Sequence, residues 1–442
     1  MNILPYKLAQ TNDQLTSRAG LLAIAQLMSS LNLSERIDNA FPLPKSNRGF
    51  KPSAFIQTFI LMQHEGSFHL DDVRHIRDDK ALRTLLNLKN MPAASALGNW
   101  LRRIGAQSNT VTAWQAVNKV LLKSSLHNRK AITLDIDASE VVANKSDAQW
   151  TYKKNKGYMP MVGHMAETGQ VVACDFRPGN ASPSRENLEF IQQCAQSLPD
   201  GCYVQALRID AAGYQAKIIE YCDEKEIEYA IRAKTSKAIK DYINERSDED
   251  WQPMLNRQGE SMDGYDTCRT VHVISEYEKP FTLIIQRKRL NGQALLDLEE
   301  SDTGEGIQSG GYLYRSIATN KENWEDSDII HWYNQRGEHS ENRIKELKLD
   351  FGGDTLPCSD FDANALYFMI SALSYNLFAL MRQLLPESLA HHRAVTIRWR
   401  LYAMAAKVVK TGRQLYVKLQ AAHQTQLQQV LDALRRFEPP PI

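Results

Sequence analysis

WYNQRGEHSENRIKELK, residues 332–348, places an aromatic residue, an arginine, carboxylates and lysines in one short segment. If the segment is helical, Tyr333 and Arg336 lie about one turn apart, because an α-helix has about 3.6 residues per turn. Gly337 follows directly. We expect it to break or bend the helix, since glycine in a helix interior costs about 1 kcal/mol relative to alanine.

Beyond Gly337, a carboxylate and two lysines share one predicted helix face. Glu341, Lys345 and Lys348 stand at positions i, i+4 and i+7. A carboxylate holds a hard cation through oxygen, and basic side chains hold phosphate. The ordinary alternative is a solvated surface helix, because a Glu–Lys pair at i, i+4 is common and contributes only ~0.2–0.5 kcal/mol. Spacing alone leaves both interpretations open.

The order Tyr333, Arg336, Glu341, Lys348 resembles the Tyr-Arg-Glu-Lys signature of bacterial insertion-sequence transposases with a DDE active site, most closely the thirteen-eighty family. The steps from tyrosine to arginine (336 − 333, three) and from glutamate to lysine (348 − 341, seven) match that signature. The step from arginine to glutamate is five residues here (341 − 336) and four in the signature. A bend at Gly337 would absorb the additional residue.

A second glutamate competes for the place of the signature carboxylate. Glu338 lies closer to the arginine, but only Glu341 has lysines both four and seven residues further on. We therefore prefer Glu341.

Composition limits the class of protein. The chain has 442 residues with 53 Lys and Arg against 52 Asp and Glu, for a net charge of +1, so a nucleic-acid-binding protein of this composition must segregate its cations. The length predicts two to three domains. The six cysteines lack C-x-x-C spacing, which argues against a zinc site or a disulfide scaffold. With no signal-peptide pattern and no apolar run approaching ~20 residues, we expect a soluble cytoplasmic protein without a membrane partner.

The periodicity of apolar residues changes along the chain. The N-terminal region follows a helical period and is expected to be either a helix-turn-helix that reads DNA or a packed helical cap. From residue 130, strands come first in a meander and then alternate with helices, which predicts a mixed α/β fold. The predicted segments are a helical N-terminal DNA-binding or cap domain (1–128), the first part of a catalytic core (129–235), a β-rich insertion (236–318), the second part of the core (319–385) and a basic C-terminal region (386–442).

Two aspartates stand at the ends of predicted strands. Asp137 ends the strand of residues 131–137, and Asp210 ends the strand of residues 203–210. In open sheets, strand ends are where ligands and metals bind. The alternative for each is a turn-forming aspartate, which is common at such positions.

Together with Glu341, these aspartates resemble the DDE triad on a ribonuclease-H-like fold: an acid on the first strand, a second acid before a small-residue turn, and a glutamate on the helix after a β insertion. Asp135 is the rival first acid, and on a strand it shares a face with Asp137. We choose Asp137 because it lies nearer the strand end and because its spacing to Ser139 fits the family.

The resemblance implies a reaction as well as a fold. Three carboxylates can hold two Mg²⁺ or Mn²⁺ ions ~3.5–4 Å apart for in-line displacement at phosphorus. The implied function is a cut-and-paste transposase that binds the terminal inverted repeats of its element, cleaves DNA and joins the ends to target DNA, as a homodimer on DNA. Tyr333, Arg336 and Lys348 are then expected to contact the DNA end, with Lys345 on the same helix face.

Basic residues gather towards the end of the chain. Residues 382–419 hold eight Lys or Arg against one acid, and the stretch around Thr411-Gly412 is typical of a β-hairpin. The alternative is a solvated basic face, but this is the densest cationic segment of the chain and our candidate for contacting a phosphate backbone. The DNA-binding candidates are Arg398, Arg400, Lys410 and Arg413.

Two other functions fit the same residues. A metal-dependent nuclease would use the same triad, since the triad does not distinguish hydrolysis from strand transfer. An inactive DNA-binding protein descended from a transposase is the other alternative.

Overall fold

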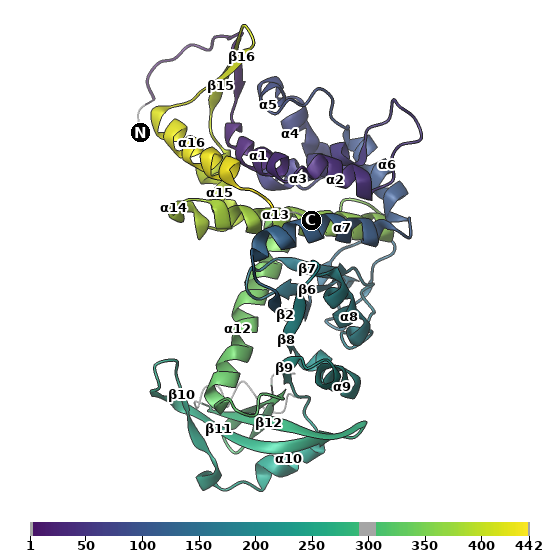
Figure 1. Cartoon of the computed structure of the whole chain (residues 1–442), viewed down its shortest axis with the longest axis vertical. Helices are drawn as coiled ribbons and strands as arrows, with labels where there is room; N and C mark the ends of the chain where they lie inside the picture. The colour runs from purple at the N-terminus through teal and green to yellow at the C-terminus, as the bar shows by residue number, and fades with distance from the viewer. Residues whose placement is uncertain (1–2, 291–305, 441–442) are drawn as a thin grey trace. The chain divides into compact units, whose positions relative to one another are not determined.

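A computed structural model describes residues 3–290 and 306–440, without the side chains of residues 338–341. The chain forms two compact units (Figure 1). One is Leu126–Lys345; the other combines Met1–Ser125 with Glu346–Ile442. The five predicted segment boundaries remain predictions.

A large mixed sheet runs through the Leu126–Lys345 unit. Its strand order is β10-β11-β12-β14-β9-β8-β2-β6-β7, with β13 beside β14. The pairs β2–β8 and β8–β9 are parallel, and the other neighbouring pairs are antiparallel. The predicted mixed α/β class is confirmed. The strands are β2 (Ala131–Ala138), β6 (Met161–Met165), β7 (Val171–Asp175), β8 (Tyr203–Ile209), β9 (Glu228–Arg232), β10 (Gln252–Leu255), β11 (Ser261–Ile274), β12 (Tyr277–Arg289), β13 (Ile307–Ser309) and β14 (Tyr312–Thr319).

The strand-rich segment between the second aspartate and α12 (Asp326–Lys345) continues this same sheet, because β14 pairs with β9. A small separate sheet of β3 (Val141–Val142), β5 (Lys156–Tyr158) and β4 (Gln149–Trp150) follows β2 in the chain. Among the described residues of this unit, the other helices are α8 (Asn187–Ser197), α9 (Ala216–Glu224) and α10 (Lys237–Asn244), with 3₁₀ turns η3 (Ala211–Gly213) and η4 (Asp248–Asp250).

Helix α12 lies across one face of the large sheet (Figure 1). Ile329, Ile330 and Tyr333 of α12 are buried with Ala230 of β9 and Ile317 of β14 in one apolar cluster. Burial of apolar side chains contributes ~25 cal/mol per Å². This cluster therefore holds α12 against β9 and β14.

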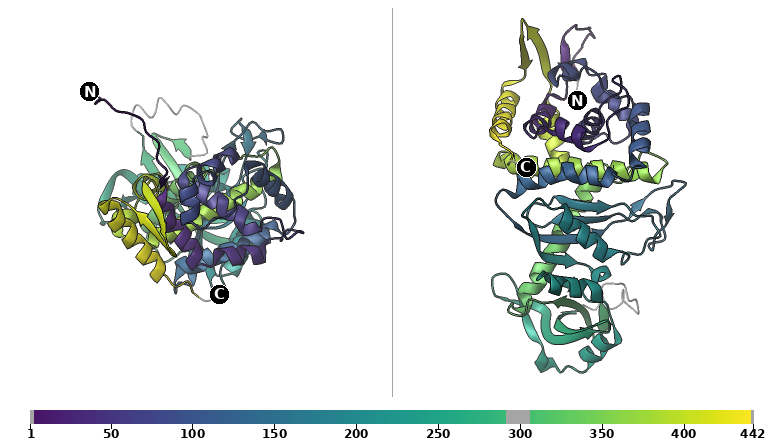
Figure 2. Two further views of the ribbon diagram at one scale, coloured as in Figure 1. Left: turned by 90° about the horizontal axis from the view of Figure 1, so that it is seen from above. Right: turned by 45° about the vertical axis from the view of Figure 1, so that its right-hand side comes forward.

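The other unit is mostly helical and is built around α13 (Phe361–Leu384). The indole of Trp114 donates a hydrogen bond to the carbonyl of Met369 (2.6 Å), and the amide of Gln63 donates to the hydroxyl of Ser371 (2.9 Å). Figure 2 shows α7 (Thr110–Leu126) running beside α13, as the first of these bonds requires. By length and composition α13 could cross a membrane, so the expectation that no apolar run approaches that length is wrong, but 94% of its most apolar stretch is buried inside the protein. It is packed as the core helix of this unit.

Segments from both ends of the chain meet in this unit. β1 pairs with β15, β15 pairs with β16, and α1 packs against α16. The elements are β1 (Gln14–Thr16), η1 (Ala19–Leu21), α1 (Leu22–Ser30), α2 (Leu33–Ala40), α3 (Pro52–Glu65), η2 (Leu70–Val73), α4 (Arg74–Arg77), α5 (Lys80–Leu85), α6 (Ala94–Gly105), α7 (Thr110–Leu126), the π-helical η5 (Glu346–Asp350), α13, α14 (Glu387–Ala390), α15 (Ala394–Ile397), the π-helical η6 (Arg398–Tyr402), β15 (Ala406–Thr411), β16 (Gln414–Lys418) and α16 (Ala421–Arg436).

Candidate active site and nucleic-acid surface

Asp137 and Asp210 lie at the same edge of the large sheet. Ile136 of β2 is the register partner of Ile209 of β8, so the two aspartates follow directly at the ends of neighbouring parallel strands. The side chain of Asp137 is 22% exposed. Oδ1 of Asp210 accepts a hydrogen bond from the backbone N–H of Ala212 at 3.0 Å. Parallel strands carry their carboxyl ends to one edge, which is why residues 73 positions apart (210 − 137) come together.

Arg336 of α12 faces this acidic edge. Its Nη1 lies 3.9 Å from Oδ1 of Asp137 and donates to the carbonyl of Ile136 at 3.3 Å. Burial alone would lower the pKa of Arg336, but Tyr333, Asp137 and Asp210 raise it, and the net shift is upward. Nε of Arg336 is buried without a hydrogen-bond partner in the part of the chain that the structure describes. The guanidinium is thus held charged beside both aspartates.

Tyr333 packs beneath Arg336, with the guanidinium 5.6 Å from the ring centroid. Burial raises the pKa of Tyr333, the charges of Arg336 and Arg232 oppose the shift, and Asp210 adds to it. The phenol therefore stays protonated at neutral pH and can donate a hydrogen bond.

Asp135, the rival first acid, is enclosed by Arg208. Both carboxylate oxygens of Asp135 accept from the guanidinium, at 2.7 and 2.8 Å. Asp135 is 0% and Arg208 2% exposed. Arg208 also donates to the carbonyl of Trp332 at 2.5 Å, and its guanidinium lies over the Trp332 ring. This pair ties β2 and β8 to α12 and leaves neither oxygen of Asp135 open to a ligand.

The expected bend at Gly337 is wrong. Helix α12 runs without interruption from Asp326 to Lys345, and Gly337 has open space around it. A single glycine costs a helix only about 1 kcal/mol, and the apolar packing of α12 on the sheet exceeds that cost. The additional residue between arginine and glutamate is therefore not absorbed by a bend there.

The remaining signature residues are only partly described. Glu341 lies within α12, but its side chain, like that of Glu338, falls outside the described residues. Lys345 is exposed at the end of α12, and Lys348 lies in η5, which belongs to the other unit. Their shared face and their contacts with DNA remain predictions.

The two aspartates fit a hard divalent cation by their chemistry, because Mg²⁺ and Mn²⁺ prefer carboxylate oxygens. Arg336 offsets one of the two negative charges, so the edge keeps a net negative charge that can attract a cation. Among the side chains that are described, three or more His, Cys, Asp or Glu nowhere gather closely enough to hold a metal. Glu341, the expected third ligand, is not among them.

The predicted basic residues of the C-terminal region make different contacts in the structure. Arg398 donates to the backbone carbonyls of Gln63 (2.8 Å) and His64 (2.9 Å), and also to that of Asp350. It is thus used inside its unit, and its contact with DNA is a prediction that no bond here supports. Arg400 is exposed and lies 2.9 Å from the ring nitrogen of His392.

Lys410 and Arg413 lie on the β15–β16 hairpin and line a groove of about 610 Å³ in the same unit. Three further cations from the other wall complete it: Lys80, Arg83 and Lys89. Within the described residues, no carboxylate lines this groove. Nε of Arg83 is buried and has no hydrogen-bond partner there. Five cations without an opposing acid form a surface suited to a polyanion.

The sequence interpretation missed the α5 side of this groove, because Asp78 and Asp79 precede Lys80 and neutralise the local charge. In the structure, the carboxylate of Asp79 accepts hydrogen bonds within the protein. It caps α5 through the N–H of Leu82 (2.8 Å) and accepts from the hydroxyl of Thr16 (2.6 Å). If Asp79 had been interpreted as the N-cap of α5, the sequence would have indicated the basic face of this helix.

Comparison with known proteins gives the family. A solved structure described as the cryo-EM structure of the piggyBac transposase synaptic complex with hairpin DNA is similar, at 10% identity and a TM-score of 0.44, covering 96% of this chain and 82% of that chain. No curated protein sequence matches the chain. A family model described as "Transposase DDE domain group 1" matches residues 5–439. The resemblance to DDE transposases is confirmed at the family level, while the thirteen-eighty family and a bacterial insertion-sequence origin stay predictions. Since this match spans nearly the whole sequence, the chain belongs to the family of transposases with a DDE domain of group 1.

Proposed function

We propose that this protein is a cut-and-paste DNA transposase that cleaves the ends of its element and joins them to target DNA. The observation that carries the proposal is the meeting of Asp137 and Asp210 at one sheet edge beneath Arg336. Family membership supports the same reaction class.

Asp137 and Asp210, with Glu341, would hold two Mg²⁺ or Mn²⁺ ions. Bound there, the ions would lower the pKa of the attacking hydroxyl or water and stabilise the leaving oxygen of an in-line displacement at phosphorus. Asp135 takes no part in this scheme, because Arg208 occupies both of its oxygens. Its enclosure supports the choice of Asp137 as the first acid, on a ribonuclease-H-like arrangement of β2 and β8.

Arg336 and Tyr333 would orient the DNA end. A guanidinium already beside the two acids can donate further N–H groups to a phosphate oxygen, and charge-assisted hydrogen bonds of this kind are the strong ones. The protonated phenol of Tyr333 donates without adding negative charge near the phosphate. Lys345 and Lys348 would extend this contact along the DNA.

The groove of Lys80, Arg83, Lys89, Lys410 and Arg413 would bind duplex DNA through its backbone. Each neutralised phosphate makes log K fall with log[salt] by a slope of about −0.9. Loss of Lys410 and Arg413 should therefore reduce the salt slope of binding by about two. The partners would be the terminal inverted repeats and target DNA, bound by a homodimer in a bacterial cytoplasm at the nucleoid.

The test is a cleavage assay with the full chain, Mg²⁺ and a linear DNA that carries the ends of the element encoding it. Nicks at the element ends and joined products are expected, and Asp137→Asn and Asp210→Asn should give neither. Hydrolysis without joining would indicate a metal-dependent nuclease instead. Tight binding without breakage, also after exchange of Mg²⁺ for Mn²⁺, would indicate an inactive DNA-binding relative.

A further inference from the structure

The sheet face that carries the two aspartates continues into an arginine on the next strand. Arg208 of β8 is the register partner of Ala230 of β9, so these two residues share a face. Two residues further along the two strands, Arg232 and Asp210 lie on this same face. Its position is consistent with the opposing effect of its charge on the pKa of Tyr333.

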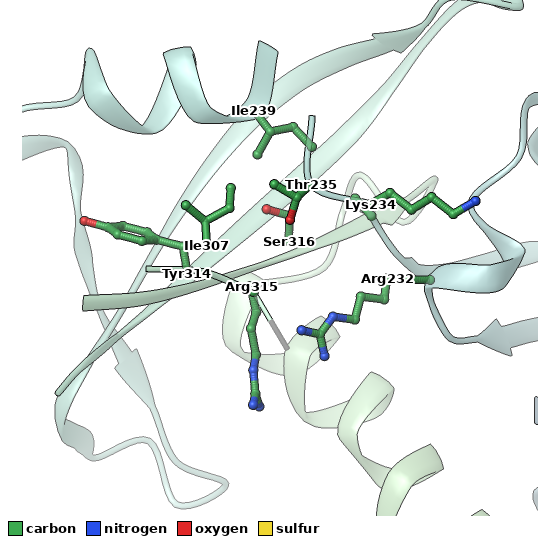
Figure 3. Close-up of a pocket in the computed structure, with 11 residues that line it drawn as sticks. Arg232, Lys234, Thr235, Ile239, Ile307, Tyr314, Arg315 and Ser316 are labelled. Carbon is green, nitrogen blue, oxygen red and sulfur yellow. The ribbon is translucent and has the colours of Figure 1, made fainter. Parts of the chain in front are cut away.

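A second arginine follows on the strand beyond. Ile317 of β14 is the register partner of Arg232, and Arg315 lies two residues before it on the same face. Figure 3 shows the guanidinium groups of Arg232 and Arg315 extending to the same side of the strands, while Tyr314 and Ser316 lie on the other side. Four neighbouring strands thus present two acids and then two arginines in order across one edge.

These arginines line a pocket of about 230 Å³ that begins at Ala211, the residue after Asp210. Lys234 is a third cation of its lining. No carboxylate is among the lining residues that the structure describes. The lining therefore has the chemistry of an anion site, with planar donors that match phosphate oxygens.

The spacing relates this site to the acids. Neighbouring strands lie ~4.8 Å apart, so Arg232 stands about one strand from Asp210 and Arg315 about two. Two carboxylates at the edge repel a phosphodiester chain, and cations immediately beside them offset that repulsion. A nucleic-acid strand with one phosphate at the acids would carry its next phosphate towards the arginines.

We propose that Arg232 and Arg315 act as a clamp for the backbone phosphate next to the scissile one, and so position the strand that is cut. This inference rests on the proposed function, because it takes Asp137 and Asp210 as the site of cleavage. The arginines are positioning residues, and their ligand is a DNA phosphodiester.

The experiment combines variants with chemically altered DNA. Arg232→Gln, Arg315→Gln and the double variant are compared with Arg257→Gln, a matched control at an exposed turn of the same unit. The substrates carry one neutral methylphosphonate in place of each phosphate beside the scissile one. With the wild-type chain, one of these replacements should slow cleavage about 10- to 100-fold, the size expected for losing charge-assisted hydrogen bonds.

In the double variant, that same replacement should have no additional effect, because the clamp is already absent. Arg→Lys at both positions should restore part of the rate and part of the methylphosphonate sensitivity. Equal denaturation midpoints for all variants exclude unfolding as the cause. Independent, multiplicative effects of the protein and DNA changes would overturn the clamp.

Two further experiments distinguish failure of the clamp from failure of the proposed function. If the wild-type chain cleaves nothing, the proposed function fails, and the clamp is then judged by binding competition between normal and methylphosphonate DNA with the same variants. A methylphosphonate penalty that persists in the double variant overturns it there also. Calorimetry with inorganic phosphate tests a free anion as the ligand: saturable binding that needs both arginines, with no methylphosphonate effect on DNA, would reassign the pocket.

Discussion

Two aspartates stand two residues apart on β2, and each faces an arginine, but the two pairs differ in almost every physical respect. In the inner pair, Arg208 binds both oxygens of a carboxylate that is 0% exposed. In the outer pair, Arg336 remains 3.9 Å from Asp137, and both side chains retain some exposure. Because Arg208 and Asp135 bind each other completely, their charges serve only to hold β2, β8 and α12 together. The outer pair is looser and more exposed than the inner pair, and exposure to solvent is a property that a catalytic edge needs.

The largest expected effect is the loss of cleavage in Asp137→Asn. Removing one metal-binding carboxylate should slow cleavage by about 10³-fold or more, or about 4 kcal/mol. The stability of the protein should change by less than about 0.5 kcal/mol, because the carboxylate is partly exposed. Cleavage rates and urea denaturation are measured on the same preparation, with DNA affinity as the control for folding. A variant that cleaves at the wild-type rate would remove Asp137 from the site.

The reverse pattern is expected for Asp135→Leu. It leaves Arg208 buried without its carboxylate, which should reduce the free energy of unfolding by about 3–5 kcal/mol. The matched control is the double variant Asp135→Leu with Arg208→Met, which removes both charges and should recover much of the stability. Denaturation midpoints decide the outcome. If Asp135→Leu is as stable as the wild type, the inner pair does not have the structural role assigned to it.

A smaller effect is expected for Arg336→Gln. The positive charge beside Asp137 and Asp210 is lost, and cleavage should fall about 10- to 100-fold, the range for a charge-assisted hydrogen bond. Arg336→Lys should retain part of the rate, because it keeps the charge but not the fork of donors. The rates are measured at saturating Mg²⁺ so that altered metal affinity does not contribute. An unchanged rate in Arg336→Gln would show that the outer arginine is dispensable.

The effect that is smallest near neutral pH is that of a buried histidine. His164 is the register partner of Asp135, and burial, followed by the charge of Arg343, lowers the pKa of His164 from 6.5 to about 3. The folded state therefore keeps this histidine neutral while the unfolded state takes up a proton below pH 6.5. Its contribution to stability is present above pH 6.5 and is lost as pH falls towards about 3, by about 1.4 kcal/mol per pH unit.

His64 has the same lowered pKa in the other unit, and burial is again the main cause. His164→Asn should therefore reduce the proton uptake on unfolding at pH 4.5 by about one, and leave that of His64 in place. Urea denaturation as a function of pH measures this. An unchanged slope would mean that His164 is protonated in the folded protein.

The strands that carry the acids could be predicted from sequence because their cause is local. Alternating apolar residues define β2, whose Ile132, Leu134 and Ile136 are buried, and a parallel neighbour then places Asp210 near Asp137. The pairing of Asp135 with Arg208 could not be predicted, since it depends on the register between two strands. The bend predicted at Gly337 was wrong for the opposite reason. The local preference of glycine is overridden by the packing of the whole of α12.

The pairing of β1 with β15 has a consequence for the order of folding during synthesis. The unit Leu126–Lys345 is one continuous stretch and can fold as soon as it has left the ribosome. β1 must wait for a partner strand that is translated 390 residues later (406 − 16). The acidic edge would thus exist in the nascent chain before the hairpin wall of the basic groove, so a chain interrupted before β15 would lack that wall.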